Sequence, residues 1–201
     1  MQVSISPNQP QHAGKTIAAL AAARGVDPID QVCDLLIADN GATRVLIASI
    51  SEDDIRTIVR SPTALVGSDG NCVADYGIVG QGLPHPRFYG TFPRIIGQYV
   101  HDERLLSLEQ AIHKMTGGSA RALKLRDRGL LAEGYRADVA IFDPADFHDQ
   151  ASYAEPHRYP SGARTSTIVN GVVVVDHARH TGATPGMVLR RGADGRVREQ
   201  A

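Results

Sequence analysis

Cysteine, long apolar runs and net charge are all scarce in this sequence. The only cysteines are Cys33 and Cys72, with no Cys-x-x-Cys pair, which favours reduced thiols. No run approaches the roughly 18 apolar residues of a membrane helix, and no basic-then-apolar leader opens the chain. A net charge of -1 gives no long-range field to attract nucleic acid or anionic lipid. We therefore expect a cytoplasmic protein with no nucleic-acid or membrane partner, which leaves a small neutral or anionic substrate open.

Helical periodicity dominates the first 60 residues. Residues 13–24 predict one helix, and residues 27–39 predict a second that starts at Asp27-Pro28. A third helix follows the cap at Ser51 and ends before Pro62, with its apolar residues expected to face inward. The inward-facing residues expected in the second and third helices are Ile29, Val32, Cys33, Leu36, Ile37, Ile55, Ile58 and Val59.

Two apolar runs flank the third predicted helix. Residues 45–48 and 64–67 are typical of strands, the first of them buried on both faces. A strand, helix, strand order predicts a βαβ unit whose two strands are parallel in one sheet.

The character of the chain changes near residue 124. Before it, we expect a helix over 93–101 that buries Phe92 with its apolar residues, and another that starts at the Ser107/Gln110 capping box. After it, residues 139–142 predict a strand, and Asn170-Gly171 predicts a type I′ hairpin over 167–175. We expect a long surface loop over 145–164 and a frayed end from Asp194. The predicted domains are 1–123 and 124–201.

Gly67-Ser68-Asp69-Gly70 is the stretch around which the chain is expected to be organised. Asp69 follows a predicted strand, and side chains at the carboxyl ends of parallel strands project into a shared mouth. The flanking glycines allow a tight turn and close approach of a ligand. Asp69 is thus the candidate catalytic carboxylate, with the capping of a turn as the alternative role.

Several further motifs accompany this stretch. They are His85-Pro86-Arg87, Gly90-Thr91-Phe92-Pro93-Arg94, Met115-Thr116-Gly117, Arg128-Gly129-Leu130, Gly134-Tyr135-Arg136-Ala137-Asp138-Val139, Phe142-Asp143-Pro144 and Val169-Asn170-Gly171-Val172-Val173-Val174. Together they resemble the C-terminal half of N-acyl-D-amino-acid deacylases of the amidohydrolase superfamily. The long run from His85 to Arg94 carries the most specific part of this resemblance.

The resemblance implies a fold and a mechanism. The fold is the C-terminal part of an α/β, (β/α)8 TIM-type metal-dependent hydrolase barrel, followed by a small β-sandwich subdomain. Zinc polarises the amide carbonyl of an N-acyl-D-amino acid and activates a water, whose proton Asp69 accepts and passes to the departing amine. Asp69 is also a possible metal ligand, and Ser68, His85 and Arg87 are the candidate substrate-binding residues.

The metal ligands of the family are expected upstream of the matched region. This sequence has no His-x-His, and a whole barrel needs about 250 residues. We therefore expect the chain to be the C-terminal portion of a deacylase, incomplete as a zinc site on its own, with a missing N-terminal half as a possible partner. Hydrolysis of a cyclic amide is the alternative activity, and a non-catalytic fragment or a subunit of a split deacylase is the alternative class.

Other roles stay open for several of these residues. Arg87 suits a bidentate contact with the α-carboxylate of the substrate, or else a surface ion pair. His85 lies between prolines, where it is either presented to the mouth or fixes its loop. Cys72 is expected to be a small buried residue, and His177 and His180 are expected to be solvated rather than to bind zinc.

Overall fold

The computed structural model describes residues 1–162, 165–192 and 197–200, in two compact units. Unit 1 comprises Met1–Ile55, Ser68–Thr91 and Gln150–Tyr159, and unit 2 comprises Arg56–Gly67, Phe92–Asp149 and Pro160–Ala201. Each unit is therefore assembled from three separate stretches of chain. Within the described residues, every helix is too short or too polar to cross a membrane.

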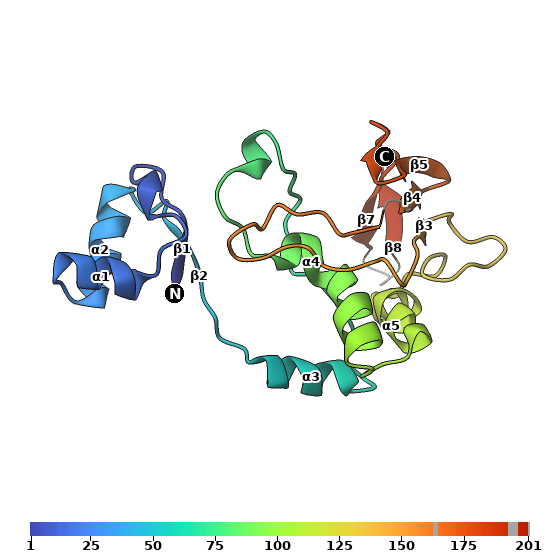
Figure 1. The fold of residues 1–201 in the computed structure, drawn as a ribbon. Coiled ribbons are helices and arrows are strands. Elements are labelled where there is room, and N and C mark those ends of the chain that lie inside the picture. Colours follow the sequence, from blue (N-terminus) through green and yellow to red (C-terminus); the bar gives the residue numbers. More distant parts are fainter. Residues whose placement is uncertain (163–164, 193–196, 201) are drawn as a thin grey trace. The chain divides into compact units, whose positions relative to one another are not determined.

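Unit 1 begins with a strand pair and a helix pair (Figure 1). Its elements are β1 (Gln2–Ile5), the 3-10 turn η1 (Pro10–His12), α1 (Ile17–Arg24), α2 (Pro28–Ala38), β2 (Arg44–Leu46) and the 3-10 turn η2 (Ile78–Gly80). Two further helices, α3 (Glu52–Arg60) and α4 (Arg87–Arg94), start in unit 1 and end in unit 2.

The first two helices form where the sequence predicts them, except that α1 begins at Ile17 rather than at residue 13. The Thr16 hydroxyl accepts a hydrogen bond from the backbone N–H of Ala19, Asp27 caps α2 in the same manner, and Gly25 ends α1 at φ 68°. α1 and β1 bury a small core with one residue of α2, and this core consists of Val3, Ile17, Leu20 and Leu35.

The buried face of α2 differs from the predicted one. Leu35 and Gln31 are buried, whereas Cys33 and the large apolar residues Ile29 and Ile37 are exposed, Ile37 by 75%. Arg24 of α1 contacts the buried side of α2, because its guanidinium donates to Gln31 at 2.9 Å. The prediction of Cys33 as a core residue was therefore wrong. Apolar residues lie on two sides of α2, and α1 covers the side that carries Leu35 rather than the side that carries Cys33.

The predicted βαβ unit does not form. β2 pairs antiparallel with β1, its residues are half-buried or exposed, and residues 64–67 are irregular. The backbone of that segment bonds to Lys114 instead of to a neighbouring strand. The Lys114 ammonium donates to the carbonyl oxygens of Ser61 and Ala64, and the Val66 N–H donates to the Lys114 carbonyl at 3.4 Å.

The capped start of α3 is as predicted, but its apolar side is not covered. The Ser51 hydroxyl accepts from the Asp54 N–H at 3.1 Å and donates to the Asp54 carboxylate at 2.7 Å. None of the residues of α3 is buried, and Ile58 is 54% exposed. The expected inward face therefore lies largely open within the described residues.

Unit 2 is helical in its first half. Its helices are the C-terminal part of α4, the π-helix η3 (Ile95–Asp102), α5 (Leu108–Met115) and α6 (Gly117–Ala122). Ile95, Ile96 and Tyr99 are buried as predicted, and the Ser107/Gln110 capping box starts α5. The first of these helices begins at Arg87 rather than at Pro93, and Phe92 is exposed instead of buried.

Strands dominate the rest of unit 2. They are β3 (Val139–Ile141), β4 (Ser166–Val169), β5 (Val172–Asp176), β6 (Arg179–His180), β7 (Val188–Arg191) and β8 (Val197–Gln200). The first four form an antiparallel sheet in the order β3-β4-β5-β6, and β7 pairs with β8. Asn170 and Gly171 link β4 to β5 at φ 47° and 80°, which confirms the type I′ hairpin.

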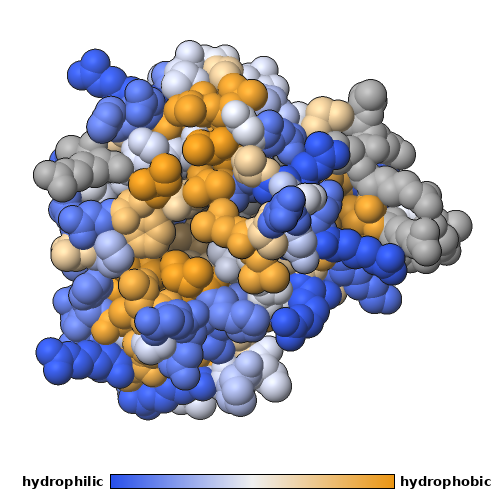
Figure 2. Space-filling view, turned by 90° about the vertical axis from the view of Figure 1, so that its right-hand side faces the viewer, coloured by the Kyte–Doolittle hydropathy of each residue, from blue (hydrophilic) through white to orange (hydrophobic). Residues whose placement is uncertain are grey.

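Of the remaining predictions for this region, the irregular loop is confirmed and the frayed end is wrong for the described residues. The described part of 145–164 is irregular, as expected. At the end of the chain, β8 pairs with β7 over 197–200, so those residues are not frayed, while Asp194 lies outside the described residues. Figure 2 shows apolar side chains exposed on the surface that it presents. The exposed apolar residues of β3, β5 and β7 include Ile141, Val172, Val173, Val188 and Leu189.

Candidate functional site

Asp69 lies in an irregular loop of unit 1 and presents its carboxylate to solvent. Its backbone is left-handed, at φ 47°, and its side chain is 90% exposed. The neighbouring Ser68 hydroxyl accepts a hydrogen bond from the Gly70 N–H at 3.2 Å, which closes a small turn around Asp69. Gly70 itself packs against α4, because a Cβ there would lie 3.4 Å from the Phe88 backbone.

Arg87 meets Asp69 directly. One terminal nitrogen of its guanidinium, Nη2, lies 2.9 Å from Asp69 Oδ2, and Nε donates to the Asp69 carbonyl oxygen at 3.2 Å. The structure thus brings together two of the four predicted site residues, which are 18 positions apart in the sequence. The contact is an ion pair at the surface, since the Arg87 side chain is 39% exposed.

His85 caps the helix that carries Arg87. Its Nδ1 accepts the Arg87 N–H at 3.0 Å, and its carbonyl oxygen accepts the Phe88 N–H at 3.1 Å. A neutral imidazole with a lone pair on Nδ1 carries its proton on Nε2, which lies 3.0 Å from the Tyr153 hydroxyl. Desolvation, and then the charge of Arg87, lower the pKa of His85 below its usual 6.5, so both effects favour this neutral form.

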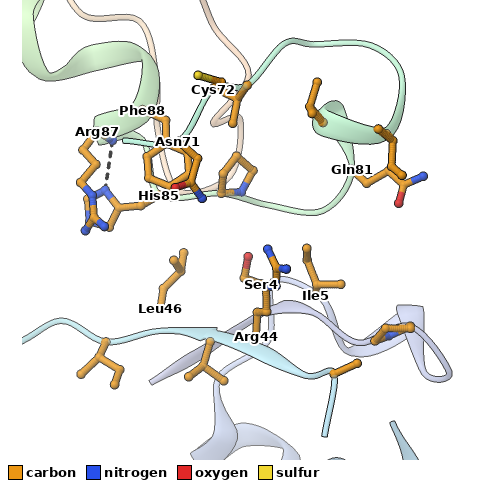
Figure 3. Close-up of a pocket in the computed structure, with 18 residues that line it drawn as sticks. Ser4, Ile5, Arg44, Leu46, Asn71, Cys72, Gln81, His85, Arg87 and Phe88 are labelled. Carbon is orange, nitrogen blue, oxygen red and sulfur yellow. Dashed lines mark hydrogen bonds between the residues drawn. The ribbon is translucent and has the colours of Figure 1, made fainter. Parts of the chain in front are cut away.

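A pocket of about 740 Å³ opens beside Arg87 within unit 1. Figure 3 shows it between the β1–β2 pair and the segment from Asn71 to Phe88, with His85 and Arg87 at one end. Its size falls in the range of small-molecule sites. Arg44 also lines it, so two guanidinium groups border the same space.

The sequence analysis missed a set of aromatic contacts from residues 150–159. Tyr153 and His157 each bond to the segment that carries Arg87, as does Tyr159 through Asp75. The region was expected only to be a surface loop. Its two tyrosines and one histidine were an available signal in the sequence, because aromatic rings and tyrosine hydroxyls commonly make specific contacts.

The remaining candidates are two histidines with local contacts and one cysteine of the pocket lining. His177 is exposed beside Asp176, and the His180 imidazole accepts from the Gly182 N–H at 2.9 Å. Cys72 lines the pocket and is exposed, which corrects its prediction as a small buried residue. Across residues 1–162, 165–192 and 197–200, no three His, Cys, Asp or Glu side chains are grouped so that they could hold a metal ion.

Comparison with known proteins identifies close sequence relatives. A model described as the amidohydrolase family matches residues 6–175. The N-acyl-D-aspartate deacylase of Alcaligenes xylosoxydans xylosoxydans is 36% identical over 190 residues, which cover 94% of this chain and 36% of that protein. The D-aminoacylase of the same organism is 37% identical over 184 residues, which cover 92% of this chain and 35% of that protein.

Solved structures give the same result. A crystal structure of D-aminoacylase matches with a TM-score of 0.78 at 33% identity, over 90% of this chain and 36% of that one. The N-acyl-D-glutamate deacylase from Bordetella bronchiseptica, complexed with zinc and a phosphonate inhibitor, matches with a TM-score of 0.73 at 32% identity, over 97% and 36%. The mixed helix and strand fold is thus that of D-aminoacylases, and the chain spans about a third of their length.

Proposed function

The chain belongs to the amidohydrolase family, and we propose that it is the C-terminal portion of a zinc-dependent N-acyl-D-amino-acid deacylase. The reaction is hydrolysis of the amide bond to a carboxylate and a free D-amino acid. The observation that carries this proposal is the contact between the Asp69 carboxylate and the Arg87 guanidinium at a glycine-flanked loop. The deacylase relatives that match more than nine-tenths of the chain support the substrate class.

The two halves of the chain take different parts of that enzyme. Residues 1–123 are the C-terminal part of the hydrolase barrel, and residues 124–201 are the β-sandwich subdomain. This division is supported by the distribution of elements, because every described helix of four or more residues ends by Ala122 and all strands except β1 and β2 start after Asp138.

Asp69 is the proton-transfer group in the proposed mechanism. Its carboxylate accepts a proton from the attacking water as the water oxygen bonds to the amide carbon. The same proton then moves to the nitrogen as the C–N bond breaks, so the amine leaves neutral. The exposure of the Asp69 side chain, at 90%, supports this role because a reacting group must be reachable.

Arg87 holds the α-carboxylate of the substrate. A guanidinium that bonds to one carboxylate can exchange it for another, and a planar fork binds a free carboxylate in bidentate fashion. The Arg87 Nε–H stays on the Asp69 carbonyl oxygen while the terminal nitrogens exchange, which frees the Asp69 carboxylate as the substrate enters. Ser68 and His85 support the loop and the helix on either side of this pair.

Zinc supplies Lewis-acid activation in the proposed enzyme, but the described residues do not form its site. A catalytic zinc takes about three protein ligands, and no such group exists among the described residues. Asp69 can contribute one ligand at most. The other ligands belong to the remaining two-thirds of the length over which the relatives extend beyond this chain.

The proposal is tested by substituting Asp69→Asn in the zinc-loaded enzyme that contains this chain. We expect the kcat for N-acetyl-D-methionine to fall by about 10²–10⁴-fold, the usual contribution of a general acid–base. Asp30→Asn is the matched control, because Asp30 lies exposed on α2, and it should leave kcat unchanged. Turnover of dihydrouracil instead would indicate a cyclic-amide hydrolase, and turnover of neither substrate would indicate a non-catalytic protein.

A further inference from the structure

Residues 150–159 form a compact turn, here called the clasp. The Ser152 N–H donates to the Glu155 carbonyl oxygen at 3.2 Å, and the Ser152 hydroxyl accepts from the Glu155 N–H at 3.0 Å. The Glu155 carboxylate pairs with Arg158 through both of its oxygens at 3.1 Å. Pro156 is fully buried at the centre of the turn. The clasp therefore has a defined shape and an anchor, although it contains no helix or strand.

Tyr153 connects the clasp to His85. Its hydroxyl lies 3.0 Å from His85 Nε2, and the two rings meet edge to face with centroids 5.2 Å apart. The opposite nitrogen of His85 accepts the Arg87 N–H. Because Nδ1 must accept, Nε2 carries the proton and donates it to the tyrosine oxygen. Tyr153 thus fixes the plane of the ring that caps the first turn of α4.

His157 connects the clasp to the other side of the same segment. Its Nε2 lies 3.0 Å from the Gly82 carbonyl oxygen, which can only accept, so Nε2 carries the proton. Its Nδ1 is then the acceptor for the Tyr89 hydroxyl at 3.1 Å. Tyr89 also meets the ring of Tyr159 edge to face at 5.3 Å. One imidazole therefore ties the loop before α4 to the helix itself.

We propose that the clasp positions Arg87 for the α-carboxylate of the substrate, with Tyr153 and His157 as its positioning residues. Tyr153 acts through His85 on the Arg87 backbone, and His157 acts through Tyr89 and Gly82 on the segment around it. The proposal rests on the proposed function for its ligand, a free carboxylate, but the contacts that it assigns are independent of catalysis. A side chain that extends from a fixed backbone loses less conformational freedom on binding, so the clasp raises the affinity of Arg87 for a carboxylate.

The first experiment measures the clasp without any activity. Amide hydrogen exchange is recorded by NMR on the 201-residue chain for wild type and for the double variant Tyr153→Phe/His157→Phe, which keeps an aromatic ring at both positions and removes three hydrogen bonds. Each bond lost should speed local opening by about three- to tenfold, so the amides of Arg87 and Gly90 should exchange at least tenfold faster. The amide of Leu20 in α1 should not change.

Imidazole nitrogen shifts give a signature that general loosening would not produce. In wild type, both His85 and His157 should have the Nε2-protonated tautomer, and Tyr153→Phe should move the Nε2 resonance of His85 while that of His157 stays. Tyr135→Phe is the matched control, because within the described residues no hydrogen bond of its hydroxyl is observed. Unchanged exchange in the double variant, or the other tautomer at either histidine, would overturn the proposal.

The second experiment separates the clasp from the proposed function. N-acetyl-D-alanine and its uncharged amide are titrated into wild type and into the single clasp variants Tyr153→Phe and His157→Phe, while the Arg87 Nε–H resonance is followed. We expect the carboxylate alone to shift this resonance, with a Kd that rises three- to tenfold in each single clasp variant. If wild type does not distinguish the carboxylate from the amide, the substrate role of Arg87 fails while the exchange data still decide the clasp. If wild type does distinguish them and the clasp variants bind the carboxylate equally well, the proposal that the clasp positions Arg87 is refuted.

Discussion

The β4–β5 hairpin and the loop around Asp69 achieve order in opposite ways. The hairpin is a local structure, because Asn170-Gly171 adopts the turn and the strands on either side pair with each other. The Asp69 loop has no regular pairing of its own. It is held by partners far along the chain, such as Arg87 at 18 positions, while the following loop bonds to the Ser4 hydroxyl at a separation of 79.

This difference explains why the contacts of the Asp69 loop were harder to predict from the sequence than those of the hairpin. A turn sequence specifies dihedral angles that depend on only two or three residues. A loop that depends on distant partners is specified only when the rest of its unit has folded. We therefore expect substitutions of distant partners to act on the site region strongly, and substitutions in the hairpin to act locally.

The largest effect is expected from Lys114→Met, which removes the distant partner of the segment before Asp69. Lys114 is only 7% exposed, and its ammonium donates to two carbonyl oxygens, of Ser61 and Ala64. Losing these charged bonds leaves both carbonyls without that donor, so the free energy of unfolding should fall by about 2–4 kcal/mol. Urea denaturation measures it. Lys15→Met, at an exposed lysine, should cost almost nothing, and equal losses in the two variants would refute the distinction.

A smaller effect is expected from Gly171→Ala in the hairpin. Gly171 has φ 80°, a conformation that disfavours a Cβ, although a Cβ there would meet no other atom within 4 Å. The cost should therefore be purely one of backbone conformation, about 1–2 kcal/mol. Gly186→Ala is the control, because its surroundings are equally open without a positive φ. Thermal unfolding compares the two, and faster amide exchange at Arg87 in Gly171→Ala would contradict a local effect.

The smallest effect concerns pH and sharpens the account of the Asp69 loop. The pKa of His85 is lowered from 6.5 by desolvation and by Arg87, so the unfolded chain takes up this proton first as the pH falls. The stabilisation is thus full above pH 6.5 and is lost as the pH falls through the lower, folded pKa. His85→Asn keeps an acceptor for the Arg87 N–H without titrating. Urea midpoints at pH 7.5 and 5.0 should differ less in this variant than in wild type.

The sequence predicted the elements that depend on near neighbours. Gly25 ends the first helix in the left-handed conformation, the Ser107/Gln110 box starts α5, and Asn170-Gly171 forms its turn. Each of these signals acts through hydrogen bonds or dihedral angles within a few residues, so a single chain segment contains all the required information. The choice of Asp69 and Arg87 as candidates was possible for a related reason, since their residue types and motif are visible in the sequence itself.

Only the tertiary structure decided which surfaces are covered and which distant groups meet. Periodicity identified apolar residues on α2 but could not say that α1 would cover Leu35 and leave Ile37 open. The sequence of the apolar segment 64–67 is typical of a strand. Its backbone groups nevertheless bond to the ammonium and to the carbonyl oxygen of Lys114 instead of to a neighbouring strand. The clasp is a further case, because a contact between Tyr153 and His85 spans 68 positions. Such contacts depend on the folded path of the chain, which no local pattern encodes.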